Sequence, residues 1–116
     1  MADKKALLIS LYDAISRQDV DGVLSVMHPD VDWPDTIEGG RVLGREAMRA
    51  YWSSQFEIIR PSLSMVEFEE RPDGSVLTRV IYTRYALDGA LWDDQIEGNL
   101  FRFEDNLIIF GDWVQR

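Results

Sequence analysis

The apolar residues change their spacing halfway along the chain, and this change restricts the possible folds more than any other feature. Up to about residue 59 they recur every three or four positions, as on one face of a helix. From residue 63 onward the sequence has the composition of strands separated by turns. Helices followed by consecutive strands predict an α+β fold, in which three N-terminal helices pack on one face of a curved antiparallel β-sheet.

Three helices are predicted. The first spans residues 3–17, and its apolar face consists of Leu7, Leu8, Leu11 and Ile15. Asp19 is a typical N-cap for a second, shorter helix, which Pro29 would end. The third spans about 44–59 and ends before Pro61, because a proline disfavours helical backbone at the residue before it.

Five extended segments are predicted. Residues 31–36 form a short one, in which Pro34 requires a sheet edge or a bulge. The four long strands are expected at 63–71, 75–87, 91–103 and 107–115. The sequences between them, such as Asp88-Gly89 and Asp105-Asn106, are typical of tight turns, so we expect antiparallel hairpins.

Charge and length exclude several classes of protein. The chain has 21 Asp and Glu against 12 Lys and Arg, a net charge of -9. Binding to nucleic acid or to anionic lipid needs a basic surface, so neither partner is expected. No apolar run approaches the roughly 20 residues needed to span a bilayer, and we expect a cytoplasmic protein. The 116 residues predict a single domain over 1–116.

Four stretches, in this order and spacing, resemble the nuclear transport factor 2-like superfamily, and within it the SnoaL-like polyketide cyclases and the ketosteroid isomerases. They are LYDA at 11–14 with DVDG at 19–22, MHPDVDW at 27–33, GREAM at 44–48, and FRFEDNLI at 101–108. The resemblance implies a cone-shaped fold with a pocket between the helices and the concave face of the sheet. It implies no particular reaction, because this fold carries many functions.

Asp35 is the first catalytic candidate. The resemblance places it where the isomerases carry a general-base carboxylate, just after the first short strand. Trp33 and Pro34 would give it an apolar wall, which favours the protonated form of a carboxyl group. The alternative is that Asp35 is a solvated loop residue or caps a turn.

Asn99 is the second catalytic candidate. The resemblance places it where the isomerases have an acid in their oxyanion hole, and the Asn99 amide is able to donate a hydrogen bond to a developing oxyanion. The other oxyanion donor of the isomerases is a tyrosine on the first helix, where this chain has Leu11, with Tyr12 next to it. This departure argues against steroid isomerisation, and Tyr12 is expected as a core or rim aromatic residue of the pocket.

Arg79 has two possible orientations on its strand. The resemblance favours an inward Arg79, which would need a carboxylate partner such as Glu97 or Asp35, or an anionic substrate. If the alternation is reversed, Arg79 is solvated and Tyr82 enters the pocket.

Other residues are expected to line the pocket. Glu97, Asn99 and Phe101 share one face of their strand because side chains alternate across a sheet. The remaining lining residues are predicted to be Trp33, Trp52, Gln55 and Trp113.

No metal or cofactor site is predicted. The chain lacks cysteine, and its acidic pairs lack the spacing of a calcium loop. His28, the only histidine, is expected at the end of a helix as a cap.

The outer face of the sheet is predicted to be apolar, which is typical of an interface. The outward residues are expected to be Leu100, Ile108, Phe110 and Val114, with Val80 and Tyr82. We therefore expect a homodimer through this face, as the resemblance also implies.

Two kinds of function fit these residues. In the first, the protein is a cofactor-independent isomerase, cyclase or dehydratase, in which Asp35 removes a proton alpha to a carbonyl of a small apolar substrate and Asn99 stabilises the enolate. In the second, the same fold is a non-catalytic ligand-binding or dimerisation module.

Overall fold

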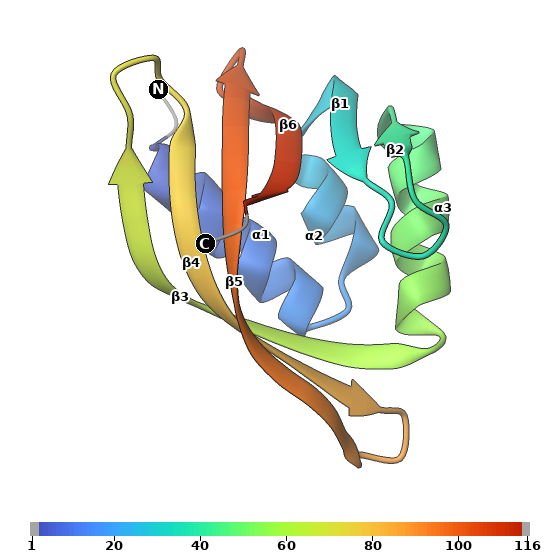
Figure 1. The fold of residues 1–116 in the computed structure, drawn as a ribbon. Coiled ribbons are helices and arrows are strands. Elements are labelled where there is room, and N and C mark those ends of the chain that lie inside the picture. Colours follow the sequence, from blue (N-terminus) through green and yellow to red (C-terminus); the bar gives the residue numbers. More distant parts are fainter. Residues whose placement is uncertain (1–2, 115–116) are drawn as a thin grey trace.

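The structure is a computed structural model that describes residues 3–114. Helices α1 and α2 come first, and the strands form one sheet against which the three helices pack (Figure 1). The elements are α1 (Lys4–Ser16), α2 (Val20–Ser25), β1 (Met27–Pro34), β2 (Arg41–Leu43), α3 (Arg45–Phe56), β3 (Ile59–Glu70), β4 (Val76–Ala86), β5 (Leu91–Glu104) and β6 (Leu107–Val114). The α+β architecture is confirmed, but only two of the helices precede the first strand.

The sheet is mixed, not fully antiparallel as predicted. Its strand order is β2-β1-β6-β5-β4-β3, and β1 runs parallel to β6. Turn residues reveal hairpins between neighbouring strands, and the hairpins from β3 to β6 are confirmed. The β1–β6 pair joins Met27 to Ile108. Local sequence signals do not report a contact over such a separation.

The start of α2 agrees with its capping signal, but its end does not, because α2 ends at Ser25 and Pro29 lies within β1. The side chain of Asp19 accepts a hydrogen bond from the backbone N–H of Gly22, as expected of an N-cap. The third helix is shorter than predicted, because β3 already begins at Ile59. Pro61 is tolerated within β3 because this is an edge strand. His28 lies in β1 and not at a helix end, and Gln115, predicted in the last strand, lies outside the described residues.

The long strands β3, β4 and β5 bend strongly, and the tip of the β4–β5 hairpin extends beyond β1 and β6 (Figure 1). The core lies between the helices and the concave face of this sheet; it includes Leu8, Leu11, Met48, Val80, Phe101 and Ile108. Within the described part of the chain, no helix is long and apolar enough to cross a membrane. The bend leaves a space between α3 and the parts of β4 and β5 that lie toward their connecting turn. The candidate site occupies this space.

The outer face of the sheet differs from the prediction at three positions. Val80 and Ile108 belong to the buried core, and Tyr82 lines the internal cavity. Ile81 and Ile96, which pair directly across β4 and β5, are instead 39% and 66% exposed. The inward and outward faces of β4 are the reverse of those expected. Val80 and Tyr82 therefore point inward, and Ile81 between them points outward.

Candidate functional site

A cavity of about 380 Å³ lies between α1 and α3 on one side and the concave face of the sheet on the other. All four tryptophans of the chain line it: Trp33, Trp52, Trp92 and Trp113. Trp52 is buried at 4% exposure, whereas Trp92 and Trp113 are largely exposed and mark the mouth. A cavity of this size with aromatic walls matches the usual form of a small-molecule site.

One polar group in the wall is built on Tyr12, at the inner side of α1. The Tyr12 hydroxyl donates to Asn99 Oδ1 at 3.0 Å and shares a hydrogen bond of 2.8 Å with Thr78 Oγ1. Burial raises the pKa of Tyr12 above its usual range, so this hydroxyl stays protonated. The Asn99 amide donates one N–H to the carbonyl of Gly98 and, as an NH2 group, has a second N–H to offer to the cavity.

A second polar group is centred on Arg84, at the inner side of β4. Its guanidinium donates to Glu97 Oε2 at 3.2 Å and to Asp93 Oδ2 at 3.0 Å. It also stacks on the Tyr82 ring, 3.8 Å from the centroid. Gln95 donates to the same Asp93 oxygen. The guanidinium is thus shared by two carboxylates, one of which, Glu97, is buried in the cavity wall.

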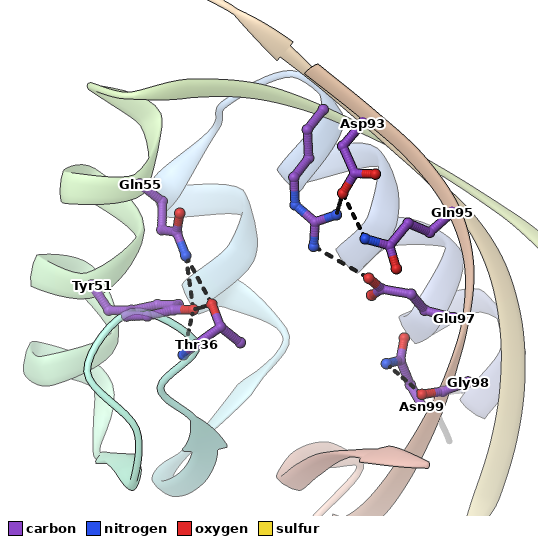
Figure 2. A network of polar contacts seen from close by, with 9 residues as sticks. Thr36, Tyr51, Gln55, Asp93, Gln95, Glu97, Gly98 and Asn99 are labelled. Carbon is purple, nitrogen blue, oxygen red and sulfur yellow. Dashed lines mark hydrogen bonds and ion pairs between the residues drawn. The ribbon is translucent and has the colours of Figure 1, made fainter. Parts of the chain in front are cut away.

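A third polar group faces the second from across the cavity (Figure 2). The Tyr51 hydroxyl lies 2.7 Å from Thr36 Oγ1 and accepts a hydrogen bond from Gln55 Nε2 at 2.8 Å. These residues come from α3 and from the loop after β1. A ligand between the two walls would therefore meet a hydroxyl and an amide on one side and a carboxylate and an amide on the other.

Eight of the ten predicted site residues line this cavity. They are Tyr12, Trp33, Trp52, Gln55, Glu97, Asn99, Phe101 and Trp113. The alternation of side chains along β5 accounts for Glu97, Asn99 and Phe101, and helical spacing places Trp52 and Gln55 on one face of α3.

Asp35 is not among the lining residues, so the structure does not place its carboxylate in the cavity, as the general-base role would require. Its Oδ1 accepts hydrogen bonds from the backbone N–H groups of Ile37 and Glu38, both at 2.9 Å. The carboxylate is therefore turned into its own loop, which is the alternative stated for it above.

Arg79 is also outside the cavity. Its guanidinium lies 3.6 Å from a carboxylate oxygen of Glu67 on β3, on the outer face. The inward arginine of β4 is Arg84, and Tyr82 enters the cavity as the reversed alternation requires. Sequence reasoning thus missed Arg84, together with Tyr51, Thr36 and Trp92. Arg84 shares its parity with Tyr82, so choosing the other alternation would have found both.

One cluster outside the cavity contains metal-ligating residue types. His28 Nε2 lies 3.5 Å from Glu104 Oε2 and 3.4 Å from Asp105 Oδ2, near the turn between β5 and β6. The backbone N–H of Asp30 donates to His28 Nδ1, so the proton of the neutral ring is on Nε2, facing the two carboxylates. Polar contacts between His28 and the acidic turn are a sufficient explanation for this cluster.

Comparison with known proteins places this fold and cavity in a defined class. The sequence matches the family model of the SnoaL-like domain over residues 8–109, and the chain therefore belongs to the SnoaL-like domain family. No match is found among curated protein sequences.

Solved structures with the same fold include an NTF2-like protein of unknown function from Burkholderia pseudomallei (23% identity, TM-score 0.82, 98% of this chain and 91% of that chain covered). RV0760c from Mycobacterium tuberculosis, in complex with estradiol-17β-hemisuccinate, is 15% identical, with a TM-score of 0.84 and coverage of 100% and 95%. A putative polyketide cyclase from Sinorhizobium meliloti is 19% identical, with a TM-score of 0.78 and coverage of 94% of each chain. At these identities the likeness shows the NTF2-like fold.

Proposed function

We propose that the protein binds a small, largely apolar molecule with a carbonyl or hydroxyl group in this cavity. The observation that carries the proposal is a cavity with aromatic walls in which three groups of hydrogen-bonding side chains converge. The structural neighbour from Mycobacterium tuberculosis, whose ligand is estradiol-17β-hemisuccinate, supports a ligand of this kind.

We further propose that the bound molecule undergoes proton transfer at the carbon alpha to its carbonyl, as in an isomerase, cyclase or dehydratase. The carbonyl oxygen would accept the second N–H of Asn99, whose carbonyl is held by the Tyr12 hydroxyl. Hydrogen bonds that are already oriented stabilise the negative charge that forms on an enolate oxygen. A non-catalytic binding module remains the second candidate, and it differs by binding the ketone without exchanging its protons.

The binding proposal is tested by titration with 2-tetralone, a bicyclic ketone, followed by tryptophan fluorescence. Because every tryptophan lines the cavity, we expect saturable quenching. Replacing Asn99 with Leu should weaken binding by about fivefold, since one hydrogen bond to a neutral group contributes roughly 1 kcal/mol. Asp94→Asn is the matched control, because Asp94 is an exposed residue of the same strand and lies outside the cavity. Quenching that rises linearly without saturation would contradict the proposal.

We also propose a homodimer through the outer face of the sheet. The exposed pair Ile81 and Ile96 lies on this face, with Leu100 and Phe110 only partly buried. An apolar patch on a sheet that already covers a core on its other side is typical of an interface.

A further inference from the structure

The cavity wall contains a buried carboxylate, that of Glu97 on β5. The residue is 8% exposed. Its Oε2 accepts a hydrogen bond from Arg84, whereas none of the donors in residues 3–114 pairs with Oε1. Oε1 is nevertheless not sealed off from solvent by the surrounding atoms. This oxygen is therefore open to the cavity.

The partners of Glu97 allow it to change its protonation state at low cost. Burying a single ion pair is expensive if one partner loses its charge, because the other is left uncompensated. Here Arg84 is shared by two carboxylates, and Asp93, held by Gln95, remains at 3.0 Å when Glu97 becomes neutral. A protonated Glu97 therefore leaves a neutral Arg84–Asp93 pair and not an unpaired guanidinium.

The other ionisable groups facing Glu97 are poorer proton acceptors. Burial raises the pKa of Tyr82 to about 12 and that of Tyr12 above its usual range, so neither phenol accepts a proton as a phenolate near neutral pH. Asp93 accepts hydrogen bonds from both Arg84 and Gln95. Burial raises the pKa of Glu97, although Arg84 acts in the opposite direction, and a raised pKa makes a carboxylate a stronger base.

Glu97 is also suitably placed with respect to the oxyanion donor. It lies two residues before Asn99 on the same face of β5, and both residues line the cavity. Positions two apart in a strand are separated by about 7 Å. A carbonyl oxygen at Asn99 would therefore leave its alpha carbon in the space between the two side chains.

We propose that Glu97 is the catalytic residue that removes the alpha proton, in place of Asp35. The C–H bond of the substrate breaks and its proton forms an O–H bond with Glu97. The electron pair left on carbon becomes the carbon–carbon double bond of an enolate, and the carbonyl π pair moves to the oxygen held by Asn99. Return of the proton from Glu97 to a different carbon completes isomerisation with no other reactant. For exchange, the carboxyl proton of Glu97 is first replaced by a deuteron from the solvent, and the deuteron is then returned to the alpha carbon. This inference rests on the proposed function and identifies the base that it requires.

The test uses the full chain and measures the exchange of the alpha protons of 2-tetralone in deuterated buffer by NMR, in excess of the buffer rate. We expect Glu97→Gln to lower the rate by at least about 100-fold, the usual contribution of a general base. Its affinity for 2-naphthol, which has the shape of the enol, should stay within about threefold by calorimetry, because the substitution is isosteric. Asp94→Asn, the exposed carboxylate of the same strand, should exchange like the wild type.

The outcomes separate the two proposals. Exchange by Glu97→Gln at nearly the wild-type rate overturns the role of Glu97, and loss of exchange in Asp35→Asn alone would transfer that role to Asp35. A wild-type protein that binds both compounds and exchanges none of the alpha protons of 2-tetralone also overturns it, but leaves the binding function intact. Absence of saturable binding overturns the proposed function itself.

A second measurement guards against a Glu97→Gln protein that does not fold. In the wild type the exchange rate should rise through one ionisation, at a pH above that of an ordinary glutamate, and then level off. Glu97→Asp, which keeps a carboxylate on a shorter side chain, should retain part of the rate. A rate that increases in proportion to hydroxide throughout, in both proteins, would overturn the proposal.

Discussion

Replacing Gly111 with alanine should destabilise the protein by pushing one ring of the cavity wall out of place. An added Cβ at this position of β6 would lie 2.6 and 2.7 Å from two carbons of the Trp33 ring. Carbon atoms in favourable contact are about 3.5–4.0 Å apart, so the ring must retreat by about 1 Å. Forcing a side chain out of a packed position in this way typically costs about 1–3 kcal/mol.

The same substitution has an opposite effect on the unfolded chain. Gly111 is not among the glycines with positive φ, so an alanine meets no backbone strain there. Under these conditions a glycine-to-alanine change stabilises by about 0.4–1 kcal/mol, because the unfolded chain loses conformational freedom. The contact with Trp33 therefore determines the sign of the observed change.

A double-mutant cycle with Trp33→Leu isolates this contact. Leucine lacks the ring atoms that the new Cβ would meet, so Gly111→Ala should become neutral or slightly stabilising in that background. Urea unfolding of the four proteins would give a coupling energy of about 1–3 kcal/mol, equal to the cost of the contact. Gly111→Ala alone should also weaken 2-tetralone binding, because Trp33 lines the cavity. An equal cost of Gly111→Ala in both backgrounds would refute the assignment to the Trp33 ring.

Three further predictions concern a hydrogen bond, an ionisation and an interface. Tyr12→Phe should lower the free energy of unfolding by about 1–3 kcal/mol in urea, because it leaves the buried Thr78 hydroxyl without its hydrogen bond to Tyr12; an unchanged midpoint would contradict this. Burial raises the pKa of Glu97, so the stabilising contribution of this side chain is present in acid and is lost as the pH rises through the folded-state pKa. The free energy of unfolding of the wild type, relative to that of Glu97→Gln, should therefore fall from pH 4 to pH 8. A difference between the two proteins that stays constant over this range would be inconsistent with the raised pKa. Ile96→Glu should convert a dimer into a monomer in sedimentation experiments, whereas a wild type that is already monomeric at micromolar concentration would disprove the interface.

The fold was predictable where it depends on local chemistry. Apolar spacing defines α1, the Asp19 cap begins α2, and turn residues such as Asp88-Gly89 define the long hairpins. The parallel pairing of β1 with β6 was not predictable, because it joins segments about 80 residues apart and no turn connects them directly. Because of this pairing the sheet is mixed and not antiparallel as expected, but the cavity lies where it was predicted, between the helices and the concave face.

Most of the site was predictable, and one of the errors concerns which face of β4 points inward. On β4, Arg79 and Arg84 occupy opposite faces, and the period of two alone does not say which face is inward. The orientation is fixed by a contact remote in sequence, that of the Tyr12 hydroxyl with Thr78. The prediction for Asp35 failed because of a local contact and not a remote one. Two backbone N–H groups in its own loop bind its carboxylate and hold it there.

The size of the cavity explains why its walls are not purely apolar. A dry void of about 380 Å³ would cost roughly 9 kcal/mol at about 24 cal/mol per Å³, comparable with the whole stability of a small domain. The polar groups around Tyr12, Tyr51 and Arg84 provide hydrogen bonds for water, so the cavity is tolerated without a ligand.

The same polar groups should make the cavity select against plain hydrocarbons. A ligand that displaces bound water without replacing its hydrogen bonds loses affinity, whereas one that replaces them gains the apolar contact at little cost. We therefore expect 2-naphthol to bind at least about tenfold more tightly than naphthalene, which has the same ring system and no oxygen. The preference should shrink in the Asn99→Leu variant if the oxygen is held at that amide. Equal affinities for the two compounds in the wild type would mean that the polar groups do not contact the ligand, and carbonyl recognition in this cavity would then be refuted.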